Sequence, residues 1–326
     1  MRILHLTNGY PSAKYPTYCI FIQEQIESLR TQGILCEVIV VNPRKKGVLG
    51  YISGFIRIKA QLLLSAKYDM YHCHHILSAF LLIISNPFKK RKILLAFLNN
   101  PQTEINNLPF PIFFNKFIYY FVMKNIEHIL VKNDKNLKLE SKNVHYIPNG
   151  VNMNLFNKSS KDYSRKLLNL PLDKIIILFV SSVAIREQKR YDRFKEVLCL
   201  MKLNHGLDVH EVLMIDEKRS DIPHFYNACD IHLMTSDYEG SPNSIKEAMS
   251  CNMKIVSTNV GNVAELFEDV SNCIMSKNFD TNQIASDCYF LLKSNEKPNS
   301  RNKILEMKLD IENVALKLID TYKQII

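Results

Sequence analysis

The chain has 326 residues, of which 47% are hydrophobic, and this composition predicts a globular protein with room for two α/β domains of ordinary size. The longest apolar runs reach only about ten residues, half of what a membrane-spanning helix needs, and the chain begins with a strand pattern, so we expect neither a spanning helix nor a signal peptide. The formal net charge of +10 suits a protein that binds nucleic acid, an anionic membrane surface or an acidic substrate.

Strand and helix patterns alternate along the first half of the chain, which predicts parallel strands covered by helices. The predicted strands lie at 2–6, 36–41, 69–73, 92–97, 128–132 and 144–147, and the predicted helices at 18–32, 51–66, 76–85 and 112–125. The last of these strands runs into Pro148-Asn149-Gly150, a strong turn signal, and the polar stretch 157–166 is then predicted to be a linker.

The second half of the chain restarts the same alternation. The unbroken apolar run 175–181 predicts a buried parallel strand. The further predicted elements are helices at 189–203, 222–228, 242–251, 280–293 and 302–326, and strands at 209–215, 230–234, 254–257 and 272–276. We therefore predict two Rossmann-like, doubly wound parallel-sheet domains, with ligands bound at the carboxyl ends of their strands.

The predicted domain boundaries follow from this pattern. Residues 1–155 form the first domain and residues 156–305 the second, and the segment 306–326 is a C-terminal helix that can pack back on the first domain.

The eight cysteines are scattered without a Cys-x-x-Cys pair, which favours neither a zinc ribbon nor a redox dithiol and suits a reduced, cytoplasmic protein.

Basic residues cluster at 44–46 and 89–92, beside hydrophobic segments of the first half. These runs are compatible with solvated loops of a lysine-rich proteome, or with a protein that lies on the inner face of the cytoplasmic membrane. No nucleic-acid motif accompanies them, so we expect no nucleic-acid partner. The aromatic stretch 110–121 is compatible with core packing or with membrane contact.

The segment 236–249 is the most informative, because a buried strand ends there and a helix begins. Ser241 is a good N-cap, and Pro242 then takes the first helical position, where proline is favoured. The N–H groups of Asn243 and Ser244, with the Ser244 hydroxyl beside them, would form an anion site suited to a diphosphate.

Two glutamates flank this helix start. Glu247 shares a helix face with Asn243 and Ser244, so its carboxylate can accept hydrogen bonds from ribose hydroxyls. Glu239, in the loop before the helix, can do the same for the hydroxyls of a sugar. Two glutamates at this spacing, taken alone, would usually be solvated surface residues.

The run Glu239-Gly240-Ser241-Pro242-Asn243, with Glu247-Ala248-Met249 after it, resembles the donor-binding motif of retaining GT-B glycosyltransferases of family 4. Other parts of the sequence are similar to that family as well: the segments 227–231 and 254–261, the hinge-like segment 145–151, Tyr10-Pro11 and the segment 21–26. The resemblance is dense over residues 145–275 and thinner before them.

The resemblance implies a role for each residue of this motif. Glu239 would contact hydroxyls of the donor sugar and Glu247 would hold the ribose, with Gly240, Ser241, Asn243 and Ser244 around the donor.

An arginine and a lysine after the first strand of the second domain neutralise the diphosphate in this family. Lys189 matches the family lysine, whereas the commonest position of the arginine is occupied here by Ala184, so Arg186 would serve instead. We therefore assign catalytic roles to Glu239, Arg186 and Lys189.

The acceptor side carries fewer signals. His74 and His75 follow the third predicted strand, where they could contact acceptor or donor sugar, or serve packing alone. Many family members have a sugar-contacting histidine after the fourth strand. This chain has Asn99 and Asn100 there, and either could replace it.

The resemblance implies a metal-independent, retaining transfer of a hexose or N-acetylhexosamine from a nucleotide sugar, with UDP-sugar favoured, to a glycan or lipid-linked acceptor in cell-surface polysaccharide synthesis. No paired-aspartate loop suggests a metal, so we expect no metal and no cofactor. A glycoside hydrolase that uses the two glutamates, a nucleotide-sugar epimerase of the same fold, and a non-catalytic partner of another transferase remain as alternatives.

Overall fold

The computed structural model describes residues 1–41, 47–64, 67–88, 90–98, 101–106, 108–134, 137–181 and 186–326. The chain divides into two compact units. Unit 1 comprises Met1–Tyr10, Cys19–Asn149 and Glu312–Ile326, and unit 2 comprises Pro11–Tyr18 and Gly150–Ile311. The sequence places the corresponding boundaries at 155 and 305.

Unit 1 is built on a six-stranded sheet in the order β2-β1-β3-β4-β5-β6, and every pair of neighbours is parallel. Its strands are β1 (Arg2–Thr7), β2 (Leu35–Val40), β3 (Met70–Cys73), β4 (Ile93–Phe97), β5 (His128–Val131) and β6 (Asn143–Tyr146). All residues of the central strand β4 are buried, as expected for a strand covered on both faces.

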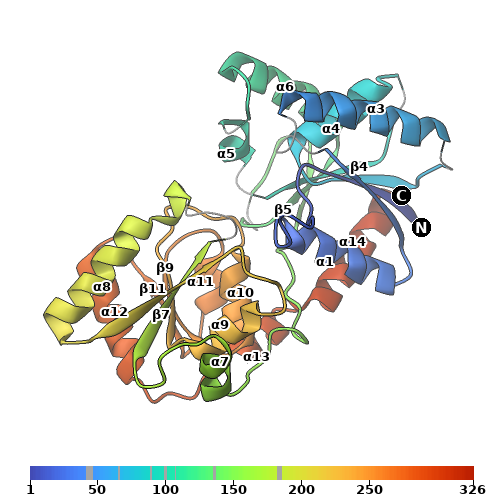
Figure 1. Ribbon diagram of the computed structural model, residues 1–326. Coiled ribbons are helices and arrows are strands. Elements are labelled where there is room, and N and C mark those ends of the chain that lie inside the picture. Colours follow the sequence, from blue (N-terminus) through green and yellow to red (C-terminus); the bar gives the residue numbers. More distant parts are fainter. Residues whose placement is uncertain are drawn as a thin grey trace. The chain divides into compact units, whose positions relative to one another are not determined.

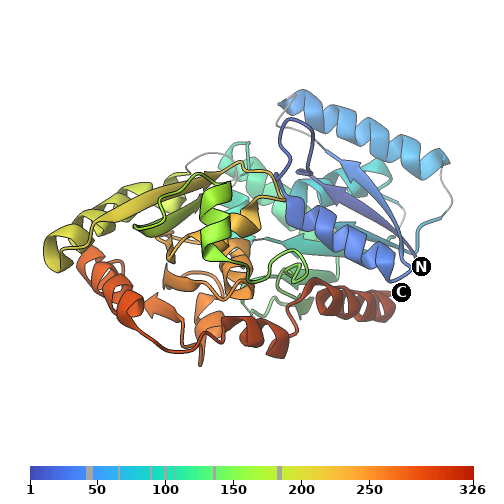
Figure 2. The ribbon, with the colours of Figure 1, turned by 60° about the horizontal axis from the view of Figure 1, so that its bottom comes forward.

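Helices cover both faces of this sheet (Figure 1). One face carries α3 (Val48–Leu64), α4 (Ile76–Ser85) and α6 (Ile112–Asn125), with the short helix α5 (Pro101–Asn106) beside α6. The opposite face carries α1 (Ile20–Thr31) and α14 (Ile311–Ile325), seen in blue and dark red in Figure 2. The C-terminal helix α14 is tied to the sheet by Tyr322, whose hydroxyl lies 2.6 Å from His72 Nδ1 of β3.

Unit 2 is built on a five-stranded parallel sheet in the order β11-β10-β9-β7-β8. Its strands are β7 (Ile175–Ser181), β8 (Val209–Ile215), β9 (Ile231–Met234), β10 (Lys254–Thr258) and β11 (Cys273–Ser276). The two sheets and their helices confirm the predicted class, a pair of α/β domains of the doubly wound kind.

The helices of unit 2 also form two layers, one on each side of the strands (Figure 1). Helices α8 (Tyr191–His205) and α12 (Thr281–Lys293) pack together on one face, over a core that includes Phe179, Phe194 and Leu233. The remaining helices are η1 (Glu187–Lys189, a 3-10 turn), α7 (Lys161–Leu167), α9 (Ile222–Ala228), α10 (Asn243–Ser250), α11 (Val263–Phe267) and α13 (Ser300–Glu306).

The predicted helix 302–326 is wrong as one continuous element. It is two helices, α13 and α14, separated by a segment in which Lys308 has a left-handed backbone with φ 53°. The reason lies elsewhere in the chain: Val151 N donates to Leu309 O at 2.9 Å, and Ile311 N donates to Val151 O at 3.0 Å. These backbone bonds to a distant residue replace the bonds that a continuous helix would make.

The predicted linker 157–166 is also wrong in part, because α7 begins within it. Ser160 caps this helix by accepting a hydrogen bond from Tyr163 N at 3.3 Å. The buried Arg165 donates to Ala228 O at 2.9 Å and pairs with Asp230 at 2.8 Å, which fixes the helix to the sheet. Arg165, which the sequence suggests is solvated, is therefore buried and holds α7 in place.

Among the described residues, no helix is both long enough and apolar enough to cross a membrane.

Candidate functional site

The predicted N-cap of α10 requires a correction. Helix α10 starts at Asn243, with Pro242 as its N-cap, and no side chain caps it. The ψ of Pro242 is 116°, which keeps this residue extended rather than helical. The Ser241 hydroxyl is used otherwise: it accepts a hydrogen bond from Lys246 Nζ at 2.7 Å, because that fully buried ammonium needs acceptors.

The loop before α10 packs backbone to backbone against the loop after β10. Gly261 has φ +58°, and a Cβ atom on it would lie 2.1 Å from Gly240 O. Only glycine tolerates both this φ and this closeness. The position of Gly240 is therefore fixed by a residue about twenty positions further along the chain.

The segment around η1 and the loop after β9 are joined by several hydrogen bonds. Thr235 Oγ1 donates to Lys189 O at 3.0 Å, and Asp237 N donates to Gln188 O at 2.8 Å. Across this junction the Lys189 ammonium pairs with Glu239 Oε1 at 2.6 Å. Ser236 Oγ donates to the same carboxylate oxygen at 2.9 Å. The fold thus brings together two residues that the sequence places fifty positions apart.

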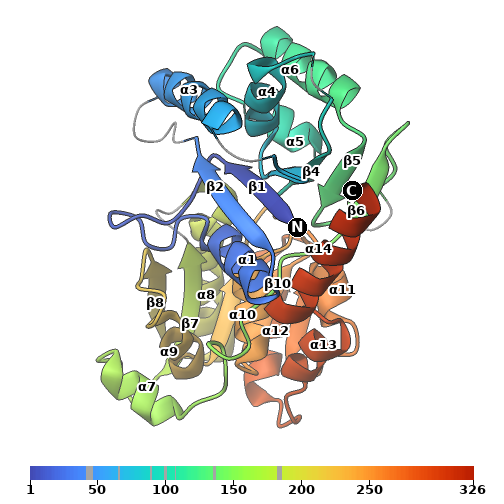
Figure 3. The ribbon, with the colours of Figure 1, turned by 90° about the vertical axis from the view of Figure 1, so that its right-hand side faces the viewer.

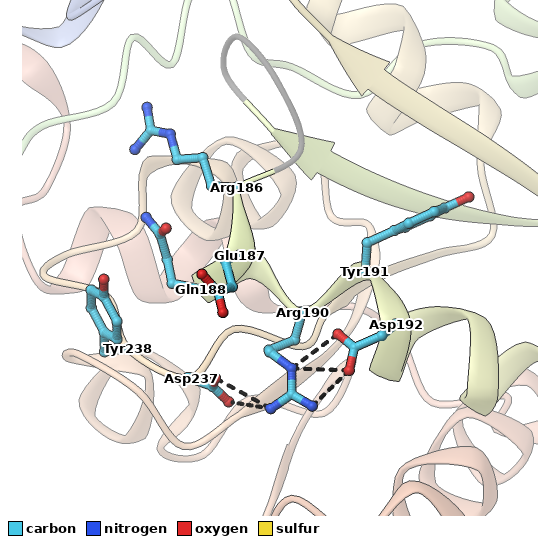
Figure 4. A pocket seen from close by; sticks show the side chains of 8 residues that line it. All are labelled: Arg186, Glu187, Gln188, Arg190, Tyr191, Asp192, Asp237 and Tyr238. Atoms are coloured by element: carbon cyan, nitrogen blue, oxygen red, sulfur yellow. Dashed lines mark hydrogen bonds and ion pairs between the residues drawn. The ribbon is translucent and has the colours of Figure 1, made fainter.

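A cavity of about 690 Å³ lies beside η1 (Figure 4). It is lined by Arg186, Glu187, Gln188, Arg190, Tyr191, Asp192, Asp237 and Tyr238. The Arg190 guanidinium pairs with Asp192 at 2.7 Å and with Asp237 at 3.2 Å, and Arg186 points away from both (Figure 4). The hydrogen bond from Arg190 lowers the pKa of Asp192 to about 2. Arg186 therefore lines this cavity, and Arg190 is held there by two carboxylates.

Glu247 is buried rather than solvated, with an exposed fraction of 7%. Its two carboxylate oxygens have different partners: Arg219 pairs with Oε1 at 2.7 Å, and the Tyr226 hydroxyl donates to Oε2 at 2.9 Å. Burial, and then the charge of Glu247, raises the pKa of Tyr226 well above its usual value, so the phenol stays a donor. Each carboxylate oxygen has two lone pairs, so this arrangement orients Glu247 and leaves it capacity to accept further hydrogen bonds.

Ser244, in the first turn of α10, lies against a buried histidine. His232 Nε2 is 3.3 Å from Ser244 Oγ, and its Nδ1 is 3.3 Å from Leu178 O. Burial lowers the pKa of His232 to about 4, so the ring is neutral at pH 7. With its Nδ1 proton donated to Leu178 O, the ring accepts a hydrogen bond from Ser244. Asn243 stands beside Ser244 as the first residue of this helix.

The predicted acceptor-side histidines belong to unit 1. His75 is the N-cap of α4, where its Nδ1 accepts from Leu77 N at 3.2 Å and lies 2.9 Å from Asn8 Nδ2. His74 is buried, and its Nε2 lies 3.1 Å from His5 Nδ1. Both therefore have structural partners. Asn99 and Asn100, with Ala184 and the basic run 44–46, lie outside the described residues.

His5, His72 and His74 form one buried cluster, because His5 and His72 are opposite each other on β1 and β3. One ligating atom from each lies within 4.8 Å of the others. Lys132 is buried nearby, and its charge helps to lower the pKa of His72 and His74, whose largest cause is burial. When Lys132 is protonated, its charge disfavours a further cation beside the three imidazoles.

Several contacts of this site could not be read from the sequence. Arg219 and Tyr226 hold Glu247, and His232 holds Ser244, although no motif marks them. Lys246 had a signal, since it lies inside the Glu-to-Glu segment, but its burial was not expected. Charged and hydroxyl side chains near a motif become informative only once the fold shows what they contact.

We compared the chain with known protein families and structures. Residues 192–305, all in unit 2, match the family model described as glycosyl transferases group 1. A search of curated proteins finds no match to the chain.

Similarity to solved structures extends over the whole chain. A sucrose-phosphate synthase from Thermosynechococcus elongatus is similar with a TM-score of 0.77 and 15% identity, over 99% of both chains. Anabaena HepE in complex with UDP-glucose is similar with a TM-score of 0.71 and 16% identity, over 99% of this chain and 100% of that one. A glycosyltransferase from Rickettsia africae gives 0.69 and 16%, over 99% and 98%.

At these sequence identities the similarity to solved structures shows the fold alone. The family model adds a match in sequence, which lies within unit 2. The chain therefore has the GT-B fold, and residues 192–305 of its second unit match the model of the glycosyl transferases group 1 family.

Proposed function

We propose that this protein is a retaining, metal-independent glycosyltransferase that moves a hexose or N-acetylhexosamine from a UDP-sugar to a glycan or lipid-linked acceptor in cell-surface polysaccharide synthesis. The observation that carries the proposal is the contact between Lys189 Nζ and Glu239 Oε1 at 2.6 Å. It joins a candidate diphosphate ligand to a candidate sugar ligand within one unit. The match of residues 192–305 to the group 1 family supports the same assignment.

The diphosphate would be bound by the positive charge of two side chains and of one helix N-terminus. Lys189 supplies an ammonium, and Arg186 borders the cavity beside η1. The N-terminus of α10 adds N–H groups and the positive end of the helix dipole. Charge that grows on the departing diphosphate is then balanced by groups already in place, which is the work a metal does in other transferases.

The nucleoside and the sugar would be held by the two glutamates. Glu247, oriented by Arg219 and Tyr226, would accept hydrogen bonds from the ribose hydroxyls. Glu239 would exchange part of its contact with Lys189 for hydroxyls of the sugar, while the diphosphate takes the ammonium. Support for UDP as the nucleotide comes from the similar structure of HepE, which is a complex with UDP-glucose.

Retention of configuration would follow from attack on the face that the diphosphate leaves. The acceptor hydroxyl forms the new bond to the anomeric carbon as the carbon–oxygen bond to the diphosphate breaks. The hydroxyl proton passes to an oxygen of the departing diphosphate, so no side chain has to act as base. This reaction requires Lys189 and Arg186 to stabilise the diphosphate, and it requires no metal.

A panel of UDP-, GDP- and dTDP-sugars, tested by thermal shift, is the experiment for the donor. A specific donor should raise the melting temperature of the protein, because it binds the folded state alone. Transfer from the donor so identified should continue in EDTA. If no nucleotide sugar shifts the melting temperature, the proposal is wrong; if transfer stops in EDTA and returns with metal, the metal-independent step is wrong.

A further inference from the structure

Helix α3 presents an apolar stripe to solvent. Leu49, Ile52, Ile56 and Leu63 are all exposed, and Ile56 has an exposed fraction of 60%. Their spacing of three, four and seven residues places them along one side of the helix. Lys59 falls on the same side and is also exposed. A surface helix of a globular protein normally carries polar side chains there, so this stripe needs an explanation.

Helix α6 carries a second stripe of the same kind. Phe113, Phe117 and Tyr120 are exposed, with 72% for Phe113, and their spacing of four and three residues again defines one side of a helix. Lys116 and Lys124 lie on that side and are exposed. The aromatic segment 110–121 is therefore divided: Ile118 packs in the core, and this outer side does not.

The two stripes belong to one layer of unit 1. Helices α3 and α6 both pack against α4, which lies between them on one face of the sheet (Figures 1 and 3). The Tyr51 ring of α3 lies 6.3 Å from the Phe110 ring, just before α6, which links the two helices. The exposed apolar side chains of both helices thus form parts of one outer surface.

The charges on this layer have a single sign. Helices α3, α4 and α6 contain Arg57, Lys59, Lys116 and Lys124 and no acidic residue. All four basic residues are exposed. A surface that carries aliphatic and aromatic side chains together with only positive charge is complementary to the interface of an anionic lipid bilayer.

The geometry points to the outer surface of α3 and α6 as a membrane-docking surface, with an anionic phospholipid bilayer as its partner. The apolar side chains enter the boundary between headgroups and acyl chains, and the lysines contact the phosphates. A protein with no spanning helix among its described residues would be held in this way as a peripheral protein. This inference stands on unit 1 and does not depend on the proposed transfer reaction.

The test is co-sedimentation of the purified full chain with phosphatidylcholine vesicles, with and without about a quarter of phosphatidylglycerol. We expect the chain to bind the anionic vesicles, and raised salt to weaken binding without abolishing it, because the apolar contacts are not screened. The double variant Ile56→Ser, Phe113→Ser should weaken this binding by about tenfold or more. The double variant Lys59→Gln, Lys116→Gln should weaken it by about fivefold per charge.

The matched control is the double variant Leu203→Ser, Phe290→Ser on α8 and α12, whose side chains are exposed to 72% and 66%. It should bind vesicles as the unchanged chain does, and all variants should keep the melting temperature, because the replaced side chains lie on the surface. Three results would each overturn the inference: no binding to anionic vesicles, equal losses in the Ile56/Phe113 and control variants, or a wild-type dimer that becomes monomeric in the Ile56/Phe113 variant with no change in vesicle binding.

Discussion

In the proposed donor site, Lys189 and Glu239 are the two residues that we expect to matter most. Their side chains are largely enclosed, with exposed fractions of 14% and 19%, so their ion pair is less screened by water than a surface pair. Without donor each neutralises the other. A diphosphate that binds to Lys189 would free Glu239 for sugar hydroxyls, so one contact couples the two halves of donor binding.

Replacing Lys189 with alanine should therefore lower the turnover of the transferase by about a hundredfold, because the charge that balances the departing diphosphate is lost. The rate of transfer under saturating donor is the measurement. The control is Lys195→Ala, which removes an ammonium from a similar pair, Lys195–Glu211 at 2.6 Å, on the exposed side of α8. Normal turnover in the Lys189 variant would remove this residue from the reaction.

The sequence predicted this pair of residues, and it could not predict how Glu247 is held. The sequence marks Glu239, Glu247 and Lys189, because the motif that contains them is defined by spacing along the chain. Arg219 and Tyr226 reach Glu247 from the segment between β8 and β9, and only the packing of α9 against α10 brings them there. Such tertiary partners leave no local signal.

At the scale of elements, the start of α10 is fixed by its neighbours rather than by a cap of its own. Pro242 ends the extended segment, Lys246 occupies the Ser241 hydroxyl, and Gly261 supports Gly240. The sequence predicted that a helix begins here and was wrong about its cap, because Ser241 suits either role. Tertiary contacts also explain the break before α14 and the helix within the predicted linker.

Gly261→Ala should destabilise the protein and displace the loop that carries Glu239. Alanine would have to adopt φ +58°, and its Cβ would collide with Gly240 O at 2.1 Å. The free energy of unfolding should fall by about 2 kcal/mol or more, and donor affinity should fall with it. Denaturant unfolding and donor titration are the measurements.

The control for this variant is Gly206→Ala at the end of α8. Gly206 has φ +66°, and no atom lies within 4 Å of the position that a Cβ would take. Only the backbone strain applies there, so a loss of about 1 kcal/mol is expected, with donor affinity unchanged. Equal effects in the two variants would mean that contact with Gly240 is unimportant.

For the whole molecule, buried bases make stability depend on pH. Burial lowers the pKa of His5 to about 3 and that of His75 and His232 to about 4. The unfolded chain, with histidine pKa values of about 6.5, binds these protons first as the pH falls. The stability is therefore present above pH 6.5 and is lost as the pH falls towards the folded values.

We expect the melting temperature of the protein to fall steeply between pH 7 and pH 5, with up to about 1.4 kcal/mol lost per pH unit for each such histidine. Burial also lowers the pKa of Lys132, to about 7. Between pH 7 and about pH 10 the unfolded chain therefore binds this proton more tightly than the folded protein, so the free energy of unfolding should keep rising with pH over this range. Thermal melts across this range are the measurement. A flat profile below pH 7 would show that the histidines are not kept neutral.

The two sheets, their parallel strands and the presence of a donor-type motif were all predictable, since each rests on patterns local to the chain. The exposed stripes on α3 and α6 were not, because an apolar residue in a helix is assigned to the core unless the fold shows which side faces outwards. From the sequence, contact with a membrane was suggested by the basic runs 44–46 and 89–92. In the structure, the proposed membrane-docking surface lies instead on the exposed sides of α3 and α6 in unit 1.

We propose that unit 2 binds a nucleotide sugar through Glu247 and its neighbours. Calorimetric titration with the nucleotide sugar identified by thermal shift measures this binding. Glu247→Gln keeps the shape of the side chain and removes its charge, so affinity should fall by about tenfold or more. The control is Glu211→Gln, since Glu211 is also held by a cation and a tyrosine, Lys195 and Tyr191. We predict weak binding for the Glu247 variant and unchanged binding for the Glu211 variant; unchanged affinity in the Glu247 variant would show that Glu247 does not hold the donor.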